Sequence, residues 1–217
     1  MGKRLRIKDS DFSEGAISPD YKRVNYVSSA NDGQYFDLGI KRTANMKIEV
    51  VVTIPSSLYS TKKIHNIMGV DITNHIDRLG ISFSVVTANS DARIYATSND
   101  AGLYGVKQSS SIFDAKHKIA VSDSGMWLDD VKIAEKTPIA KDTYRNNNMY
   151  LMGMNRSNDA AAKHCYIKIH SAKVYDNGSV LMDLIPVKKK DGKVCILNTI
   201  NGEYITTSDG TNPTYEG

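Results

Sequence analysis

The sequence predicts an all-β domain built as a two-sheet antiparallel sandwich, on three observations. Polar and apolar side chains alternate in short runs, which is typical of strands with one buried face. Gly-containing turn dipeptides separate the late runs and supply the positive φ angles that tight hairpins need. No window of a dozen residues carries a helical stripe, although a short turn is predicted near Ser56–Tyr59. The clearest alternating runs are 47–54, 81–86 and 165–170, and the turn dipeptides are Asn177-Gly178, Asp191-Gly192 and Asn201-Gly202.

Length and composition agree with one large β domain. A chain of 217 residues buries roughly 70% of the surface that its unfolded form exposes, so it needs no disulfide or metal for stability. Tyr outnumbers Phe twelve to four. This bias suits strands with one hydrated face, where tyrosine buries its ring and leaves the hydroxyl in water.

The pattern divides the chain into an N-terminal arm, residues 1–21, and a β-sandwich, residues 22–217. More than ten short strands at this spacing indicate a sandwich or barrel rather than βαβ units. The last fifty residues are expected to form an antiparallel meander. The predicted strands lie near 22–28, 34–40, 45–54, 64–71, 78–88, 92–97, 102–107, 117–122, 126–134, 148–154, 163–176, 179–187, 193–197 and 203–207.

The arm is charged and alternates only weakly, and two interpretations stay open. It is either a free tail or a docking arm, because several of its side chains are unusually apolar for a free tail. The docking interpretation assigns partner contacts to Lys3, Arg4, Arg6 and Phe12.

Charge and hydropathy exclude several classes of partner. The net charge of +4 is too small, and too evenly spread, for a nucleic-acid-binding face. The lysine run 188–190 precedes Asp191-Gly192 and is interpreted as a solvated turn. No run of 18 apolar residues is present, so no membrane span is expected. No apolar h-region follows the basic start, so the chain either works without Sec export or has lost a leader.

A search for reactive groups yields no catalytic site. GxSxG, P-loop, GxGxxG, CxxC and HExxH motifs are absent, and we expect no cofactor and no metal. Sandwich glycosidases carry paired carboxylates on one strand face, whereas the adjacent Asp129 and Asp130 are interpreted as a turn. Weak calcium-type groupings occur at Asp71, Asn74 and Asp77 and at 89–91, and they are equally consistent with polar loops.

The remaining chemically notable residues are assigned structural roles. Cys165 and Cys195 lie in apolar strand patterns and are expected to be buried free thiols. His117 is expected to fill a satisfied strand position, and His65, His75, His164 and His170 belong to no recognised motif. An aromatic platform for sugars on one sheet face is considered for Tyr95, Tyr104 and Trp127, with core packing favoured for Trp127.

Several segments together resemble laminin-G-like, concanavalin A-like jelly rolls. The runs KHKIAV (116–121) and MWLDDV (126–131) are similar to a paired-strand motif of that family, with Asp129-Asp130 in place of its Asp-Gly turn. The runs 149–154 and 168–176 resemble its later strands. The opening segments 26–29 and 33–40 and the closing segments 174–178, 183–187 and 202–204 are similar to jelly-roll modules of gut-bacterial (Bacteroides-type) surface proteins and phage structural proteins.

This resemblance implies a non-enzymatic virion component, such as a head-decoration, fibre or tail module. It would display the jelly roll, contact other virion proteins through the arm, and bind host-surface glycan through residues that the sequence does not identify. The alternative is a bacterial cell-surface carbohydrate-binding or adhesion protein whose leader has been removed. A glycoside hydrolase is disfavoured by the missing carboxylate pair, and homo-oligomerisation stays open.

Overall fold

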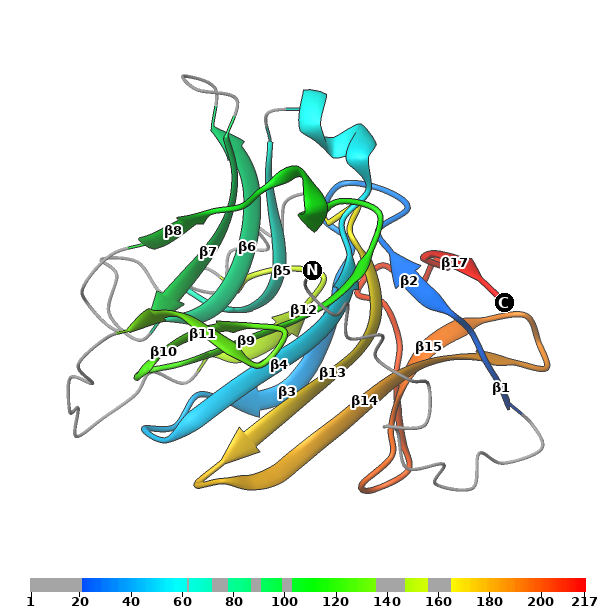
Figure 1. The fold of residues 1–217 in the computed structure, drawn as a ribbon. Coiled ribbons are helices and arrows are strands. Elements are labelled where there is room, and N and C mark those ends of the chain that lie inside the picture. Colours follow the sequence, from blue (N-terminus) through cyan, green and yellow to red (C-terminus); the bar gives the residue numbers. More distant parts are fainter. Residues whose placement is uncertain are drawn as a thin grey trace.

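A computed structural model of the chain describes residues 21–61, 63–71, 78–86, 91–98, 103–135, 147–155 and 165–217. Within them, seventeen strands form two antiparallel sheets that pack face to face (Figure 1). The predicted all-β, two-sheet antiparallel sandwich is therefore confirmed. Residues 1–20 of the predicted arm lie outside the described residues. Its last predicted residue, Tyr21, belongs instead to the first strand, because it pairs with Lys189 of a later strand.

The larger sheet, sheet A, contains eleven strands. Its main path runs β11 (Val131–Glu135), β10 (Gly125–Leu128), β9 (Lys116–Ser122), β4 (Met46–Thr53), β13 (Lys168–Asp176), β14 (Ser179–Lys189), β15 (Val194–Asn198) and β16 (Glu203–Ile205). Off this path, β1 (Tyr21–Arg23) pairs with β14, and β2 (Tyr26–Ser28) pairs with β13 and with β17 (Thr214–Glu216). The consecutive neighbours β13 to β16 confirm the predicted C-terminal meander.

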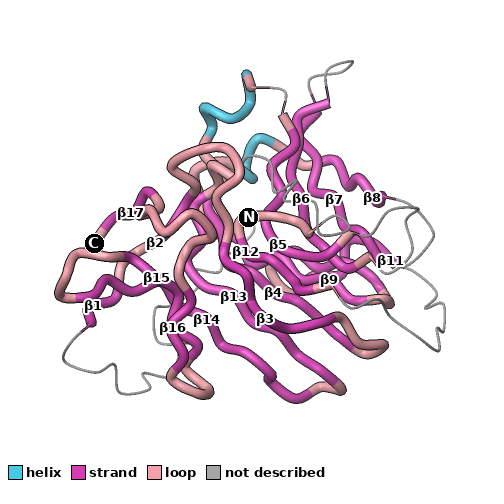
Figure 2. The backbone as a smooth tube through the Cα atoms, turned by 180° about the vertical axis from the view of Figure 1, so that it is seen from behind, coloured by secondary structure: helices cyan, strands magenta, loops and turns pink. Residues whose placement is uncertain are grey.

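The smaller sheet, sheet B, contains six strands. Their order is β3 (Phe36–Lys41), β12 (Asn148–Leu151), β5 (Ile64–Val70), β6 (Leu79–Val86), β7 (Asp91–Ser98) and β8 (Leu103–Lys107). Two 3-10 helices, η2 (Ser56–Ser60) and η3 (Ser110–Ile112), lie in connections between the sheets. Figure 2 shows these helices together at one end of the sandwich. No helix among the described residues is long and apolar enough to cross a membrane.

Alternation along each strand builds the core between the sheets. Val50 and Val52 project from sheet A, and Ile81 and Phe83 project from sheet B, and all four are fully buried in one apolar cluster. The residues between them face outward, because successive side chains of a strand point to opposite faces. Contacts between β11 and β8 on one side, and between β16 and β3 on the other, bring the sheet edges together.

The hairpin turns follow the predicted chemistry. Asn177 and Gly178 have φ angles of 49° and 80°, the pair of positive values that a two-residue type I′ turn requires. Asp129 and Asp130 have φ angles of 50° and 67°, so they adopt the same pair of positive values without a glycine. The predicted turn is thus confirmed, and the predicted continuous strand 126–134 is wrong because this turn divides it into β10 and β11.

Other predicted strand limits also need correction. The segment 22–28 forms two strands, because the chain breaks at Val24 and Asn25, whose N–H groups donate to Pro186 O and Glu216 O. The strand predicted at 163–176 begins at Lys168, and the one at 148–154 ends at Leu151 before Met152 adopts a φ of 60°. Strand β17 was not predicted, since three residues carry too little pattern to indicate a strand.

Candidate functional site

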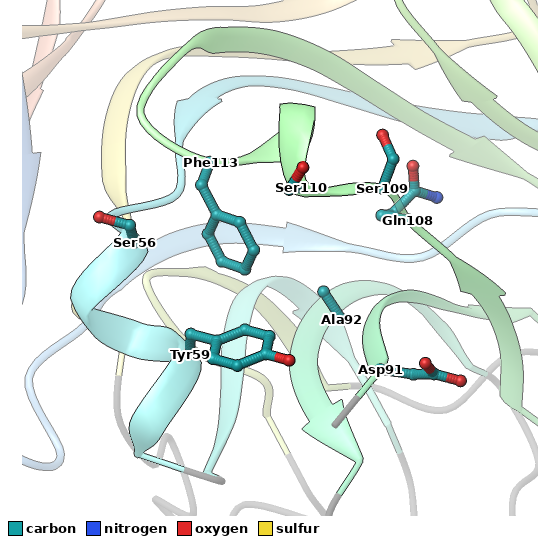
Figure 3. A pocket seen from close by; sticks show the side chains of 8 residues that line it. All are labelled: Ser56, Tyr59, Asp91, Ala92, Gln108, Ser109, Ser110 and Phe113. Atoms are coloured by element: carbon teal, nitrogen blue, oxygen red, sulfur yellow. The ribbon is translucent and has the colours of Figure 1, made fainter. Parts of the chain in front are cut away.

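A pocket of about 420 Å³ opens where η2 and η3 meet the strand pair β7–β8. A parallel bridge between Ile54 and Phe113 brings the two helical segments side by side. Figure 3 shows the Tyr59 and Phe113 rings at one end of the pocket, near Ser56, and Asp91, Gln108 and Ser109 at the other end. Its lining residues are Ser56, Tyr59, Asp91, Ala92, Gln108, Ser109, Ser110 and Phe113.

The aromatic end is anchored to the core through edge-on ring contacts. The Tyr59 ring meets Phe113 with centroids 5.8 Å apart at 83°, and Phe113 meets the buried Phe83 at 5.9 Å and 90°. Leu58 is buried beneath η2, and the next residue, Tyr59, is 45% exposed. The pocket therefore offers a tyrosine ring that is fixed from one side and accessible from the other.

The polar end is held by ion pairs and backbone bonds. Asp91 Oδ1 lies 2.8 Å from Lys107 Nζ, and its Oδ2 lies 3.7 Å from Arg93 Nη2. The Gln108 N–H donates to Ala92 O at 2.8 Å, and Gln108 Nε2 donates to Val106 O at 3.2 Å. These bonds orient one carboxylate and one amide beside the aromatic end.

The η3 wall is fixed from behind by His117. Its Nδ1 lies 2.7 Å from Asp129 Oδ2 and its Nε2 lies 3.2 Å from Ser111 O. Both partners are acceptors, so both ring nitrogens donate when the ring is protonated. The hydrogen bond to Asp129 raises the pKa of His117 above its ordinary value and outweighs the opposing effect of burial. The prediction that His117 is satisfied within its strand is confirmed.

The η2 wall is tied to the segment that follows η3. The Ser56 N–H donates to Asp114 Oδ1 at 2.9 Å, and Asp114 has a φ of 56°. Hydrogen bonds from Ser56 lower the pKa of Asp114. This hydrogen bond joins residues 58 apart in sequence, one in the wall of the pocket and the other next to the lining residue Phe113.

The residues considered as calcium ligands have other partners where the structure describes them. Asp91 pairs with Lys107 and Arg93, and Asp71 forms an ion pair with Arg78. The other members of those groupings, Asn74, Asp77, Asn89 and Ser90, lie outside the described residues. In the described ranges, no three His, Cys, Asp or Glu side chains gather as a group that could hold a metal ion.

The aromatic predictions are partly corrected. Trp127 is half-buried on the outer face of sheet A and is not a core residue, because its neighbour Met126 takes the inward position. Tyr95 lies in β7 of sheet B, so Tyr95 and Trp127 do not share a sheet face. The Tyr104 side chain is outside the described part of the structure.

The remaining predicted residues fall into two groups. Cys165 and Cys195 are buried free thiols, as expected. His65 and His170 are also buried. The structure does not describe His75, His164 or the arm residues Lys3, Arg4, Arg6 and Phe12.

Sequence reasoning missed most of the pocket. The predicted turn at Ser56–Tyr59 corresponds to η2. Asp91 was considered only as part of a weak calcium-type grouping. Gln108, Ser109, Ser110 and Phe113 follow no motif, and only folding places them opposite Tyr59.

Comparison with known proteins gives one informative likeness. No known family's sequence pattern matches this chain, and no curated protein is similar to it in sequence. Among solved structures, a protein from Bacteroides ovatus ATCC 8483 that is proposed to bind carbohydrate superposes with a TM-score of 0.52. It is 11% identical in sequence, and the match covers 90% of this chain and 60% of that protein. The likeness therefore shows a shared fold over part of a longer protein.

Proposed function

We propose that this domain is a non-enzymatic carbohydrate-binding module and that the pocket between η2 and η3 holds the sugar. The observation that carries the proposal is the exposed, anchored Tyr59 ring set beside a carboxylate, an amide and serine hydroxyls. The B. ovatus protein with the same fold, for which carbohydrate binding is also proposed, supports it.

The pocket chemistry fits a sugar ring. The face of an aromatic ring is electronegative and attracts the polarised C–H groups of a pyranose, while edges of the sugar carry hydroxyls. Asp91 accepts hydrogen bonds from such hydroxyls, and Gln108 and the serines extend the polar contacts. The volume lies at the small end of the range of about 300–1,000 Å³ for small-molecule pockets, which suits a mono- or disaccharide.

The test combines a glycan array with titration calorimetry on the full chain. Tyr59→Ala should weaken binding of the best array ligand by about threefold to tenfold, through loss of the ring contact. Tyr59→Phe keeps the ring and should bind within about twofold of the wild type, since a neutral hydrogen bond contributes little net affinity. Asp91→Asn probes the polar end with little change of shape.

Two results would refute the proposal. If the wild-type chain binds no glycan at millimolar concentration, the proposed carbohydrate-binding function is wrong. If Tyr59→Ala binds the best mono- or disaccharide as tightly as the wild type does, while circular dichroism shows both proteins folded, the sugar site is not the pocket.

The biological setting is proposed from the resemblance of the opening and closing segments to phage modules. We infer a virion protein, made in the host cytoplasm and attached through its arm, with a bacterial cell-surface protein as the alternative. Mass spectrometry of gradient-purified particles should detect the chain. Deletion of residues 1–20 should abolish its incorporation, and unchanged incorporation would remove the docking role of the arm.

A further inference from the structure

The single tryptophan of the chain, Trp127, lies on the outer face of sheet A and not in the core, where it was predicted to pack. Strand β10 directs Met126 into the core, so Trp127 faces outward and remains half-buried. Across the register, Trp127 pairs with Ala120 of β9 and Lys132 of β11.

Two aromatic rings on this face are organised around one ammonium group. Lys47 Nζ lies 5.8 Å from the centroid of the Trp127 ring and 5.2 Å from that of Tyr175. Lys132 Nζ lies 5.6 Å from the Trp127 centroid. Cations within about 6 Å of a ring are attracted to its face. The two half-buried rings therefore lie near one another on the outer face of sheet A, on either side of Lys47.

The charges that surround the two rings balance. The four lysines nearest the two rings in the strand register are each matched with a carboxylate, so this part of the face has no net attraction for a charged ligand. Lys116 and Lys168 lie further along β9 and β13, in register with Thr53. The paired groups still offer hydrogen-bond donors and acceptors to hydroxyls. The four pairs are Lys47–Glu49 at 3.3 Å, Lys118–Asp130 at 2.6 Å, Lys132–Glu135 at 2.8 Å and Lys173–Asp183 at 3.1 Å.

We propose that this surface, the Trp127 face, binds a stretch of neutral polysaccharide that lies across strands β13, β4, β9 and β10. The Trp127 and Tyr175 rings would stack on sugar units, and the ion-paired groups would bond their hydroxyls. The charge balance favours a neutral, hydroxyl-rich chain over an acidic one. The Trp127 face shares no lining residue with the pocket. The inference rests on the proposed carbohydrate-binding function but not on the pocket.

Tryptophan fluorescence tests this proposal directly, because Trp127 is the only tryptophan. The full chain is titrated with barley β-glucan, galactomannan and dextran, and with polygalacturonate as the acidic counterpart. At least one neutral polymer should shift and quench the emission to saturation, and polygalacturonate should not. The Tyr59→Ala variant should give the same titration, which separates this site from the pocket.

Variants then assign the contact. Tyr175→Ala should weaken polymer binding by about threefold to tenfold, and affinity electrophoresis should show the same loss for Trp127→Ala. Tyr95→Ala is the matched control, since Tyr95 is a half-buried tyrosine on the outer face of the other sheet, and it should bind as the wild type does. The proposal is overturned if no neutral polymer changes the emission up to its solubility limit, or if Tyr175→Ala binds as tightly as Tyr95→Ala.

Discussion

The contact between His117 and Asp129 makes the stability of the domain depend on pH in a direction that can be worked out. Asp129 occupies the first position of the β10–β11 turn, where it accepts the Lys118 N–H at 2.8 Å as well as His117 Nδ1 at 2.7 Å. The substitution Asp129→Asn keeps a residue that tolerates positive φ and keeps an acceptor for Lys118. It removes only the charge that His117 faces.

The structure sets the size of the effect. The His117 side chain is 15% exposed and that of Asp129 is 43% exposed, so solvent screens the pair and its contribution is about 0.5–1 kcal/mol. For a domain of this length, that loss lowers the melting temperature by about 1–4 °C. The expected change is small but measurable.

The sign follows from the two pKa shifts. The pKa of His117 is raised by Asp129, so the stabilisation is complete below pH 6.5 and disappears as the pH rises through the raised value. Burial raises the pKa of Asp129, but hydrogen bonds from His117 and Lys118 outweigh it and the net shift is downward. That contribution is complete above pH 3.8 and disappears as the pH falls through the lowered value. The His117–Asp129 pair therefore contributes its full stabilisation between about pH 4 and pH 6.5.

Thermal unfolding followed by circular dichroism, at about pH 5.5 and about pH 9.5, measures the effect. The melting temperature of the wild type should exceed that of Asp129→Asn by the full difference at the lower pH. At the higher pH the two melting temperatures should be almost equal. Asp130→Asn is the control, because it removes a charge from the same turn that pairs with Lys118 and not with His117. Equal destabilisation by Asp129→Asn at both pH values would refute the reasoning.

Two further predictions concern buried titratable groups. Burial lowers the pKa of His170 to about 4, and its neutral ring bonds Asn25 O and Thr53 Oγ1. Because the unfolded chain takes up the proton first, urea unfolding should show stability falling from pH 6.5 towards pH 4 by up to about 1.4 kcal/mol per pH unit. His170→Gln should flatten this slope, and an unchanged slope would contradict the assignment. Burial also raises the pKa of Cys165 to about 12 and of Cys195 to about 11. A thiol reagent such as DTNB should therefore titrate neither thiol in the native chain and both in denaturant, and rapid native labelling would show that the thiols are accessible.

The candidate site was far less predictable than the fold. The turn at Ser56–Tyr59 could be predicted locally, but the segment around Phe113 carries no pattern, and the meeting of the two depends on the parallel bridge between Ile54 and Phe113. A bridge between segments so distant in sequence leaves no local pattern. The position of Trp127 was misjudged for a related reason, because the four-residue strand β10 is too short for alternation to decide which face is inward.

By itself, the sequence determined the antiparallel sandwich. Alternation such as Val50 and Val52 against Glu49 and Val51 specifies strands, and dipeptides such as Asn177-Gly178 specify where they reverse. These are local properties of the chain, so they can be read in order. Tertiary structure alone decided which outward side chains meet: Tyr59 opposite Asp91 in the pocket, and Trp127 beside Lys47 on sheet A. Those meetings depend on strand order and register, which are fixed by the fit of the whole core rather than by any single segment.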